Sequence, residues 1–266
     1  IKEYPKSGQK KVFLVEHNEY GKVMLKLVED DNNNRIKREI QILNENHFDN
    51  VPKVIKMDNF STTDQNGLYI LEEYIDGNTL RDILNTYEKL SLDETLKLAK
   101  DLLKIIVQME DNKIVHRDIK PENIIKNTNG DWYLIDFGIA RALDLNSLTL
   151  TEVAVGPHTP GYGAPELFQY SKTNIDSRAD IFSLGVILFE SATGNHPFLR
   201  GDELDLNEIW YQTATVTPNS IQIDGDIDME FMDLIQTFMQ KLITRRPSTA
   251  KKALEWFNVV NTHINS

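Results

Sequence analysis

The chain has 266 residues, with 29 Lys and Arg against 41 Asp and Glu, so its formal net charge is −12 at pH 7. An apolar content of 40% is typical of a folded globular protein, and the negative charge argues against general binding to nucleic acid or to anionic membranes. The absence of cysteine excludes disulfides, thiolate zinc sites and cysteine nucleophiles. No run approaches the roughly 18 apolar residues that predict a membrane span.

Short β-rich runs separated by Asn, Asp and Gly dominate the first 75 residues. These predicted strands are Val12–Val15, Lys22–Val28, Val54–Met57 and Leu68–Tyr74. One helix is expected between the second and third of them. Asn34 is its predicted cap, and Ile36, Ile40 and Leu43 share one face.

The apolar period becomes helical after Asp76-Gly77-Asn78. Leu80–Tyr87 predicts a short helix, and Ser91 to Glu94 is a capping-box pattern that opens a longer one. The inner face of that longer helix is expected to carry Leu98, Leu102, Ile105 and Met109.

The rest of the chain alternates between loop and helix. Residues 114–142 predict a loop with short apolar runs at 124–125 and 132–135, and residues 143–165, rich in Thr, Gly and Pro, predict a long functional loop. Residues 181–191 are apolar all round, which predicts a central, buried helix. Further helices are expected around 204–213, 228–242 and 248–262. The coarse architecture is therefore α+β, a small β-rich lobe followed by a larger helical lobe.

One polar cluster points to phosphate chemistry. It is the run His116 to Asn123, followed 18 residues after Asp118 by Asp136. Asp118, Asn123 and Asp136 offer hard oxygen atoms of the kind that Mg²⁺ prefers. Lys120 adds a positive charge two residues from Asp118. A carboxylate, a lysine and an oxygen-lined metal site are suited to positioning a polyphosphate and a hydroxyl nucleophile.

The run His116-Arg117-Asp118-Ile119-Lys120-Pro121-Glu122-Asn123 resembles the catalytic loop of serine/threonine protein kinases. Other motifs of that family follow in its order from about Lys6 to Trp256. They are Val23–Lys26 for the third strand, Glu39 for the paired helix glutamate, Asp136-Phe137-Gly138, Ala164-Pro165-Glu166, Asp180 to Gly185 with Phe182 for the family's Trp, and Arg246. The chain is thus identified as a member of the eukaryotic-type (Hanks-type) kinases. The resemblance implies one two-lobed domain over 1–266, with an N-lobe of about 1–74, a hinge of about 73–78 and a C-lobe of about 79–266.

The resemblance also implies roles for individual residues. Asp118 would accept the substrate hydroxyl proton, and Lys120 would stabilise the transferring phosphoryl group. Asn123 and Asp136 would bind Mg²⁺. Lys26 would hold the ATP phosphates and be kept in place by Glu39. Lys120 and Thr159 favour Ser/Thr substrates over Tyr.

Adenine is expected to bind the Glu73 carbonyl and the Ile75 amide, between Val12 and Ile125. A hydrophobic column would join the lobes and stand on Asp180; its members would be Leu43, Met57, His116 and Phe137. Glu166 and Arg246 would form a structural pair.

The sequence departs from the family pattern around the nucleotide. Pro5, Ser7 and Lys10 fall at the three glycine positions of the phosphate loop, which leaves Gly8 at its tip with Ser7 beside it. Met24 replaces a small residue against adenine. Glu72 falls at the gatekeeper position, where its carboxylate would either accept a hydrogen bond from the adenine amino group or pair with a nearby lysine.

Arg117 before Asp118 is typical of kinases that depend on a phosphorylated activation loop. The candidate residues for that phosphate are Thr151, then Thr149, and Ser147. Autophosphorylation would require self-association of two copies. The bare Ile1 start predicts a domain of a longer protein, located in the cytoplasm.

Three functions are weighed. The first is an ATP- and Mg²⁺-dependent serine/threonine kinase acting on protein substrates. A pseudokinase scaffold is favoured by the eroded glycine loop together with Met24 and Glu72. A small-molecule kinase is disfavoured by Thr159, Arg246 and the Ala164–Glu166 motif.

Overall fold

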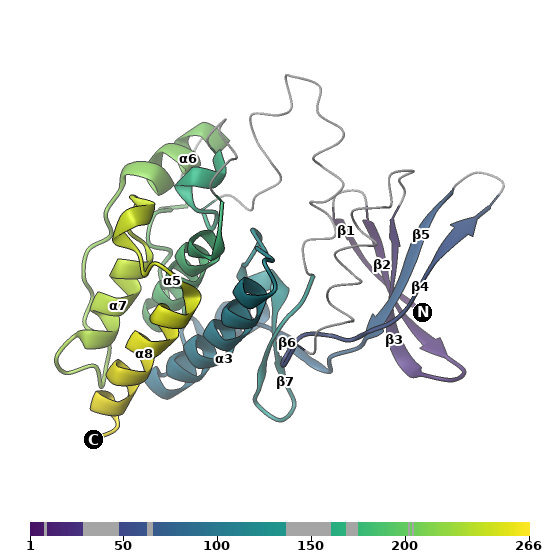
Figure 1. Ribbon diagram of the computed structural model, residues 1–266, viewed down its shortest axis with the longest axis horizontal. Coiled ribbons are helices and arrows are strands. Elements are labelled where there is room, and N and C mark those ends of the chain that lie inside the picture. Colours follow the sequence, from purple (N-terminus) through teal and green to yellow (C-terminus); the bar gives the residue numbers. More distant parts are fainter. Residues whose placement is uncertain are drawn as a thin grey trace.

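The computed structural model describes residues 1–7, 10–28, 48–62, 66–136, 161–168, 175–201, 203 and 205–266. An antiparallel sheet occupies one side of the molecule and a group of helices the other (Figure 1). The strands of the sheet are ordered β1-β2-β3-β5-β4. Their bounds are β1 Lys2–Ser7, β2 Lys10–His17, β3 Gly21–Val28, β4 Val54–Ser61 and β5 Asn66–Glu73.

The second region is helical with one small sheet. The helices are α2 Leu80–Tyr87, α3 Leu92–Asp111, α5 Ser177–Thr193, α6 Leu206–Thr215, α7 Glu230–Phe238 and α8 Ala250–Ile264. Three short strands, β6 Gly77–Thr79, β7 Ile124–Asn127 and β8 Trp132–Leu134, pair antiparallel between this helical region and the larger sheet (Figure 1). This arrangement confirms the predicted α+β architecture with a β-rich lobe and a helical lobe. Among the described helices, none is both long and apolar enough to cross a membrane.

Helix starts follow the capping chemistry of the sequence. The Ser91 side chain accepts from the Glu94 amide at the start of α3, as the capping box predicts. Asp176, Asp205 and Thr249 cap α5, α6 and α8 in the same way. The Thr79 side chain caps α2, and the predicted bounds of this helix are confirmed. The other predicted helix starts lie within a few residues of the observed caps.

Two expectations about element bounds were wrong. The helix expected over 228–242 is only Glu230–Phe238. The segment after it is held by Arg246, whose guanidinium donates to the carbonyls of Gln240 and Lys241 at 2.7 and 3.4 Å. Strand β1 was not among the predicted runs, and its sequence contains Pro5. Proline is tolerated there because β1 is an edge strand of the sheet.

The core of the helical lobe is built around α5. This helix is buried on all sides because α3, α7 and α8 pack against it. The predicted inner face of α3, which includes Leu98 and Leu102, is fully buried in the same cluster. A smaller cluster of Val28, Leu68 and Ile70 lies on the large sheet, with Met57 packed against it.

The segment before β4 fastens the two lobes together. The Asp49 amide donates to Gln108 of α3 at 2.9 Å, and the Asn50 side chain donates to the Trp132 carbonyl of β8 at 2.9 Å. The Leu134 amide donates in return to the Asn50 carbonyl at 3.0 Å. The residues that lead into β4 are therefore hydrogen-bonded both to α3 and to β8, the strand that precedes Asp136.

Gly185 lets α5 and α7 approach closely. A Cβ atom at this position would lie 2.8 Å from the Phe238 Cβ and 2.9 Å from the Met239 Cγ. We expect Gly185→Ala to destabilise the protein by about 1–2 kcal/mol, because overpacking outweighs the gain in helix propensity. Urea denaturation measures this change, with Asn258→Ala on the exposed face of α8 as the control for helix propensity alone. Equal or greater stability of Gly185→Ala than of the wild type would contradict the expectation.

Candidate active site

The loop between α3 and β7 is suspended from a buried carboxylate. Asp180, in the first turn of α5, has no exposed surface. Its two oxygen atoms accept hydrogen bonds from the backbone amides of His116 and Arg117, each at 2.8 Å. Arg117 has a left-handed backbone with φ of 66°, and these bonds help to hold it there. The loop backbone is therefore fixed just before Asp118.

Asp118, Lys120 and Asn123 converge at the end of this loop. The Lys120 Nζ lies 3.3 Å from the Asp118 Oδ2. The Asn123 side-chain amide donates to the Asp118 carbonyl at 3.0 Å and approaches the Asp118 carboxylate at 3.4 Å. Asp118 and Lys120 are both partly exposed, with side-chain exposures of 24% and 20%. A carboxylate and an ammonium group thus share one accessible position.

Asn123 and Asp136, the two expected metal ligands, lie close together. The Ile135 amide donates to the Asn123 carbonyl at 2.8 Å, so the chain end of β8 runs beside Asn123 and continues directly into Asp136. Because the Asn123 amide nitrogen is directed at Asp118, its side-chain oxygen is available to a cation. An amide oxygen and a carboxylate suit Mg²⁺, which prefers a few protein oxygens together with phosphates and water.

Lys26 connects the sheet to this site. Its ammonium lies 3.2 Å from the Asp136 Oδ1 and 2.6 Å from the Glu72 Oε2. Of the two expected uses of Glu72, the structure shows the pairing with a lysine. The predicted partner of Lys26, Glu39, lies outside the described residues, so that pairing stays a prediction.

The expected adenine site lies along the edge where β5 ends. Strand β5 stops at Glu73, and residues 74–76 have neither helix nor strand structure before β6. Val12 faces Lys26 across β2 and β3, and Met24 faces Glu72 across β3 and β5. Ile125 lies on β7, paired with Tyr133 of β8, and Ile75 is buried. The roles of these residues toward adenine stay predictions.

The expected phosphate loop lies between β1 and β2. The two strands pair as far as Ser7 and Lys10, and the two residues between these positions lie outside the described residues. Several expected residues lie outside the described residues and stay predictions. They are Gly8, Glu39, Leu43, Phe137, Ser147, Thr149, Thr151 and Thr159.

Comparison with known proteins decides the family. The pattern of the protein kinase domain matches residues 9–257. The chain belongs to the protein kinase family.

Relatives of this kinase are serine/threonine kinases, many of them bacterial. A probable serine/threonine-protein kinase of Clostridium acetobutylicum is 32% identical over 203 residues, which are 76% of this chain and 30% of the relative. PknB of Mycobacterium tuberculosis is 39% identical over 49% of this chain and 20% of its own length. The fission yeast kinase cds1 is 30% identical over 91% of this chain and 52% of its own length. The matched region thus spans about a fifth to a half of these relatives, and the predicted resemblance to serine/threonine kinases is confirmed.

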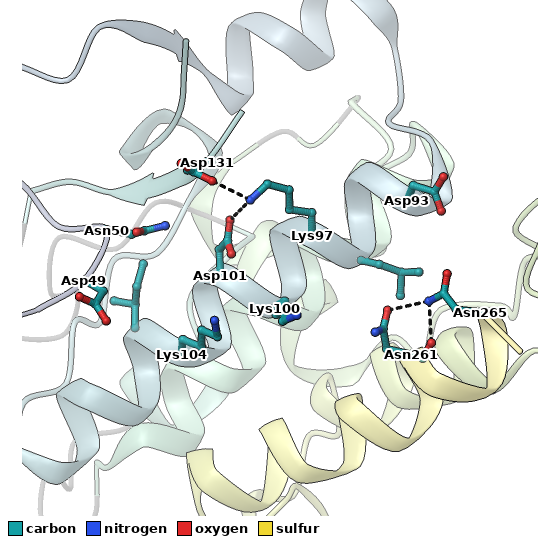
Figure 2. A pocket seen from close by; sticks show the side chains of 12 residues that line it. Asp49, Asn50, Asp93, Lys97, Lys100, Asp101, Lys104, Asp131, Asn261 and Asn265 are labelled. Carbon is teal, nitrogen blue, oxygen red and sulfur yellow. Dashed lines mark hydrogen bonds and ion pairs between the residues drawn. The ribbon is translucent and has the colours of Figure 1, made fainter. Parts of the chain in front are cut away.

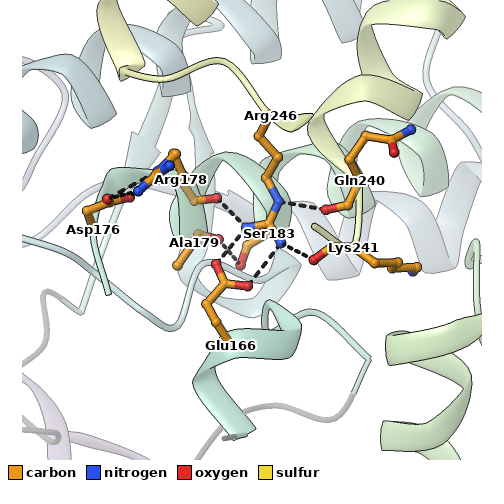
Figure 3. A network of polar contacts seen from close by, with 8 residues as sticks. All are labelled: Glu166, Asp176, Arg178, Ala179, Ser183, Gln240, Lys241 and Arg246. Carbon is orange, nitrogen blue, oxygen red and sulfur yellow. Dashed lines mark hydrogen bonds and ion pairs between the residues drawn. The ribbon is translucent and has the colours of Figure 1, made fainter. Parts of the chain in front are cut away.

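A buried ion pair fastens the end of the activation segment of this kinase. Arg246 donates to both carboxylate oxygens of Glu166, at 2.6 and 2.9 Å, and its side chain has no exposed surface (Figure 3). It also donates to the Arg178 carbonyl of α5 at 2.9 Å and to the Gln240 carbonyl at 2.7 Å. One guanidinium therefore joins the 3₁₀ turn Pro165–Phe168, α5 and the segment after α7.

Sequence analysis missed a second polar network beside the catalytic loop. Arg81 of α2 donates to Glu122 at 2.9 Å, to Glu190 of α5 at 2.8 Å and to the Tyr162 hydroxyl at 2.5 Å. The Tyr162 hydroxyl in turn donates to Glu190 at 2.5 Å. Burial and the Glu190 carboxylate raise the pKa of Tyr162 above its ordinary value of 10.0, which keeps the donating proton in place. The sequence signal that could have indicated this network is Glu190, a charged residue near the end of an otherwise apolar run.

A cavity of about 640 Å³ lies between α3 and α8, and it contains none of the expected site residues. Figure 2 shows that Lys97 spans Asp101 and Asp131 at its rim, while Asn261 and Asn265 line the other side. Because Asp118, Lys120, Asn123 and Asp136 are absent from its lining, this cavity is separate from the site around Asp118.

The Glu166–Arg246 pair gives a stability prediction. We expect Glu166→Gln to destabilise the protein by about 3 kcal/mol, because the buried guanidinium of Arg246 would lose its counter-charge. Asp131→Asn is the matched control, since its pair with Lys97 is nearly half exposed and should contribute less than about 1 kcal/mol. Urea denaturation of both variants measures the difference, and equal losses would contradict the expectation.

The Asp180 anchor gives a second prediction. In Asp180→Asn, one of the two backbone amides of the catalytic loop would face an amide donor instead of an oxygen acceptor. We expect a loss of about 1–3 kcal/mol in unfolding free energy. Asp176→Asn is the control, because Asn caps helices as well as Asp and the Asp176 side chain is 47% exposed. A variant of Asp180 no less stable than that of Asp176 would show that the anchor is not needed.

Proposed function

We propose that this kinase transfers the γ-phosphoryl group of ATP to Ser or Thr hydroxyls of proteins. The single observation that carries the proposal is the convergence of Asp118, Lys120 and Asn123 on one accessible position. The relatives are named serine/threonine-protein kinases, which supports the same reaction.

The residues of the chain divide the chemistry between them. Asp118 accepts the proton of the substrate hydroxyl while the oxygen of that hydroxyl forms the new bond to the γ-phosphorus. The bond from that phosphorus to its bridging oxygen breaks, and ADP leaves with the electron pair. Lys120, 3.3 Å from Asp118, stabilises negative charge on the phosphoryl group during the transfer.

Asn123 and Asp136 are the residues that would hold Mg²⁺. The metal supplies charge neutralisation for the nucleotide phosphates when it is bound. Lys26 donates to the phosphates from the sheet side. The Glu73 carbonyl and the Ile75 amide bind adenine, with Val12 and Met24 above the ring and Ile125 below it.

The proposal extends to regulation and context. It treats residues 1–266 as one catalytic domain with its hinge at about 73–78. Phosphorylation at Thr151 or Thr149, by a second copy of the chain, would give Arg117 a charge-assisted partner beside the catalytic loop. Thr159 and Lys120 would favour Ser and Thr acceptors, and the substrates would be proteins of the cytoplasm.

Mass spectrometry after incubation with ATP and Mg²⁺ tests the activity. We expect phosphate on Ser or Thr residues of the wild type and of an added basic protein. Asp118→Asn should slow the transfer by about 10²–10⁴-fold, because the proton acceptor is lost, and Lys26→Met should slow it as well. The controls are the same incubations without ATP and without Mg²⁺.

A titration of thermal stability with ATP and Mg²⁺ separates the alternatives. A ligand at about 100 times its Kd stabilises the folded state by about 2.7 kcal/mol, which raises the melting temperature. Stabilisation without phosphate transfer would replace the proposal with a nucleotide-binding pseudokinase. No stabilisation and no transfer would replace it with a scaffold.

A further inference from the structure

The register of the sheet places Glu72 and Lys26 on one face. Met24 lies opposite Glu72, and Lys26 lies opposite Ile70, in the β3–β5 pair. Because side chains alternate along a strand, Met24 and Lys26 share a face with their partners. Glu72 and Lys26 are therefore diagonal neighbours, a separation that long side chains span.

The ion pair between Lys26 and Glu72 is more buried and shorter than the contact between Lys26 and Asp136. The Lys26 and Glu72 side chains are 7% and 9% exposed and lie 2.6 Å apart. Asp136 is 23% exposed and lies 3.2 Å from the same ammonium. The ammonium has three N–H groups, so it can keep Glu72 and turn the others toward a nucleotide.

Charge explains why a buried lysine needs this partner. Burial alone lowers the pKa of Lys26, but Glu72, and then Asp136, oppose that effect and leave the pKa well above its ordinary value of 10.5. Asp136 is also an expected Mg²⁺ ligand, so its carboxylate would be shared between Lys26 and the metal. Among the described residues, Glu72 is the carboxylate that would stay with Lys26 alone.

We propose that Glu72 is a positioning residue, which holds Lys26 from the hinge strand and directs its remaining N–H groups at the nucleotide phosphates. The proposal rests on the proposed function, since it concerns the same nucleotide site. Because Glu72 binds Lys26 in this proposal, the adenine amino group is left to hydrogen-bond with the backbone of the hinge. Loss of Glu72 should therefore affect all nucleoside triphosphates alike, whatever group their purine carries at C6.

Glu72→Gln tests the proposal through kinetics with two nucleotides. We expect kcat/KM for ATP to fall about 10- to 100-fold. It should fall by the same factor for inosine triphosphate, which lacks the C6 amino group. Glu16→Gln, an exposed carboxylate of the same sheet, is the matched control and should keep wild-type kinetics. Glu72→Asp, which restores the charge on a shorter side chain, should recover part of the loss.

Two kinetic outcomes would overturn the proposal. One is unchanged kcat/KM in Glu72→Gln. The other is a loss at least tenfold larger for ATP than for inosine triphosphate, which would assign Glu72 to the adenine amino group instead.

A measurement of nucleotide binding works even in a chain that transfers no phosphate. Isothermal titration calorimetry with ATP and Mg²⁺, and with inosine triphosphate and Mg²⁺, reports the Kd for each nucleotide. A Kd raised about tenfold for both nucleotides in Glu72→Gln supports the positioning role even if the proposed function fails, and an unchanged Kd overturns it. Glu72→Leu, with an apolar side chain beside the Val28, Leu68 and Ile70 cluster, replaces Glu72→Gln if that variant does not fold.

Discussion

The catalytic side of this kinase depends on a carboxylate placed inside the hydrophobic core. A fully buried Asp is unfavourable unless its oxygens are satisfied, and the His116 and Arg117 amides satisfy those of Asp180. The same bonds fix a loop that has no regular structure of its own. Because α5 is packed on all sides, the position of Asp118 is tied to a helix of the hydrophobic core. The geometry of the catalytic loop is thus coupled directly to the stability of the core.

Positive charges join parts of the chain that are far apart in sequence. Lys26 joins the N-lobe sheet to Asp136 after β8, Arg81 joins α2 to α5 and to the catalytic loop, and Arg246 joins the activation segment to α5. Each of these cations meets at least one carboxylate on another element. The net charge of −12 is consistent with this design, in which carboxylates surround a smaller number of cations at the joints. Removal of one partner leaves the other charged and partly desolvated, which is why such pairs are sensitive to substitution.

The sequence predicted the fold well where local chemistry decides the structure. The capping pattern that begins at Ser91 predicted the start of α3, and the period of apolar residues predicted the other helices to within a few residues. Prediction failed where a distant group competes with local preference. Arg246 binds the carbonyl of Gln240 just after the end of α7, and β1 tolerates Pro5 because only one of its edges is paired. Neither reason is visible within the segment concerned.

The sequence by itself determined the family, because the order and spacing of the motifs from Lys26 to Arg246 are properties of the chain. The same motifs predict which residues are catalytic. Tertiary structure alone decided how the charges are paired. Glu72 was compatible with a contact to adenine or to a lysine, and only the register of β3 against β5 brings it to Lys26. The Arg81–Tyr162–Glu190 network was likewise unpredicted, because its members lie about 30 to 110 residues apart in the chain. Water and salt screen Coulomb attraction beyond about 10 Å, so the pairing of charges depends on which elements the fold makes neighbours.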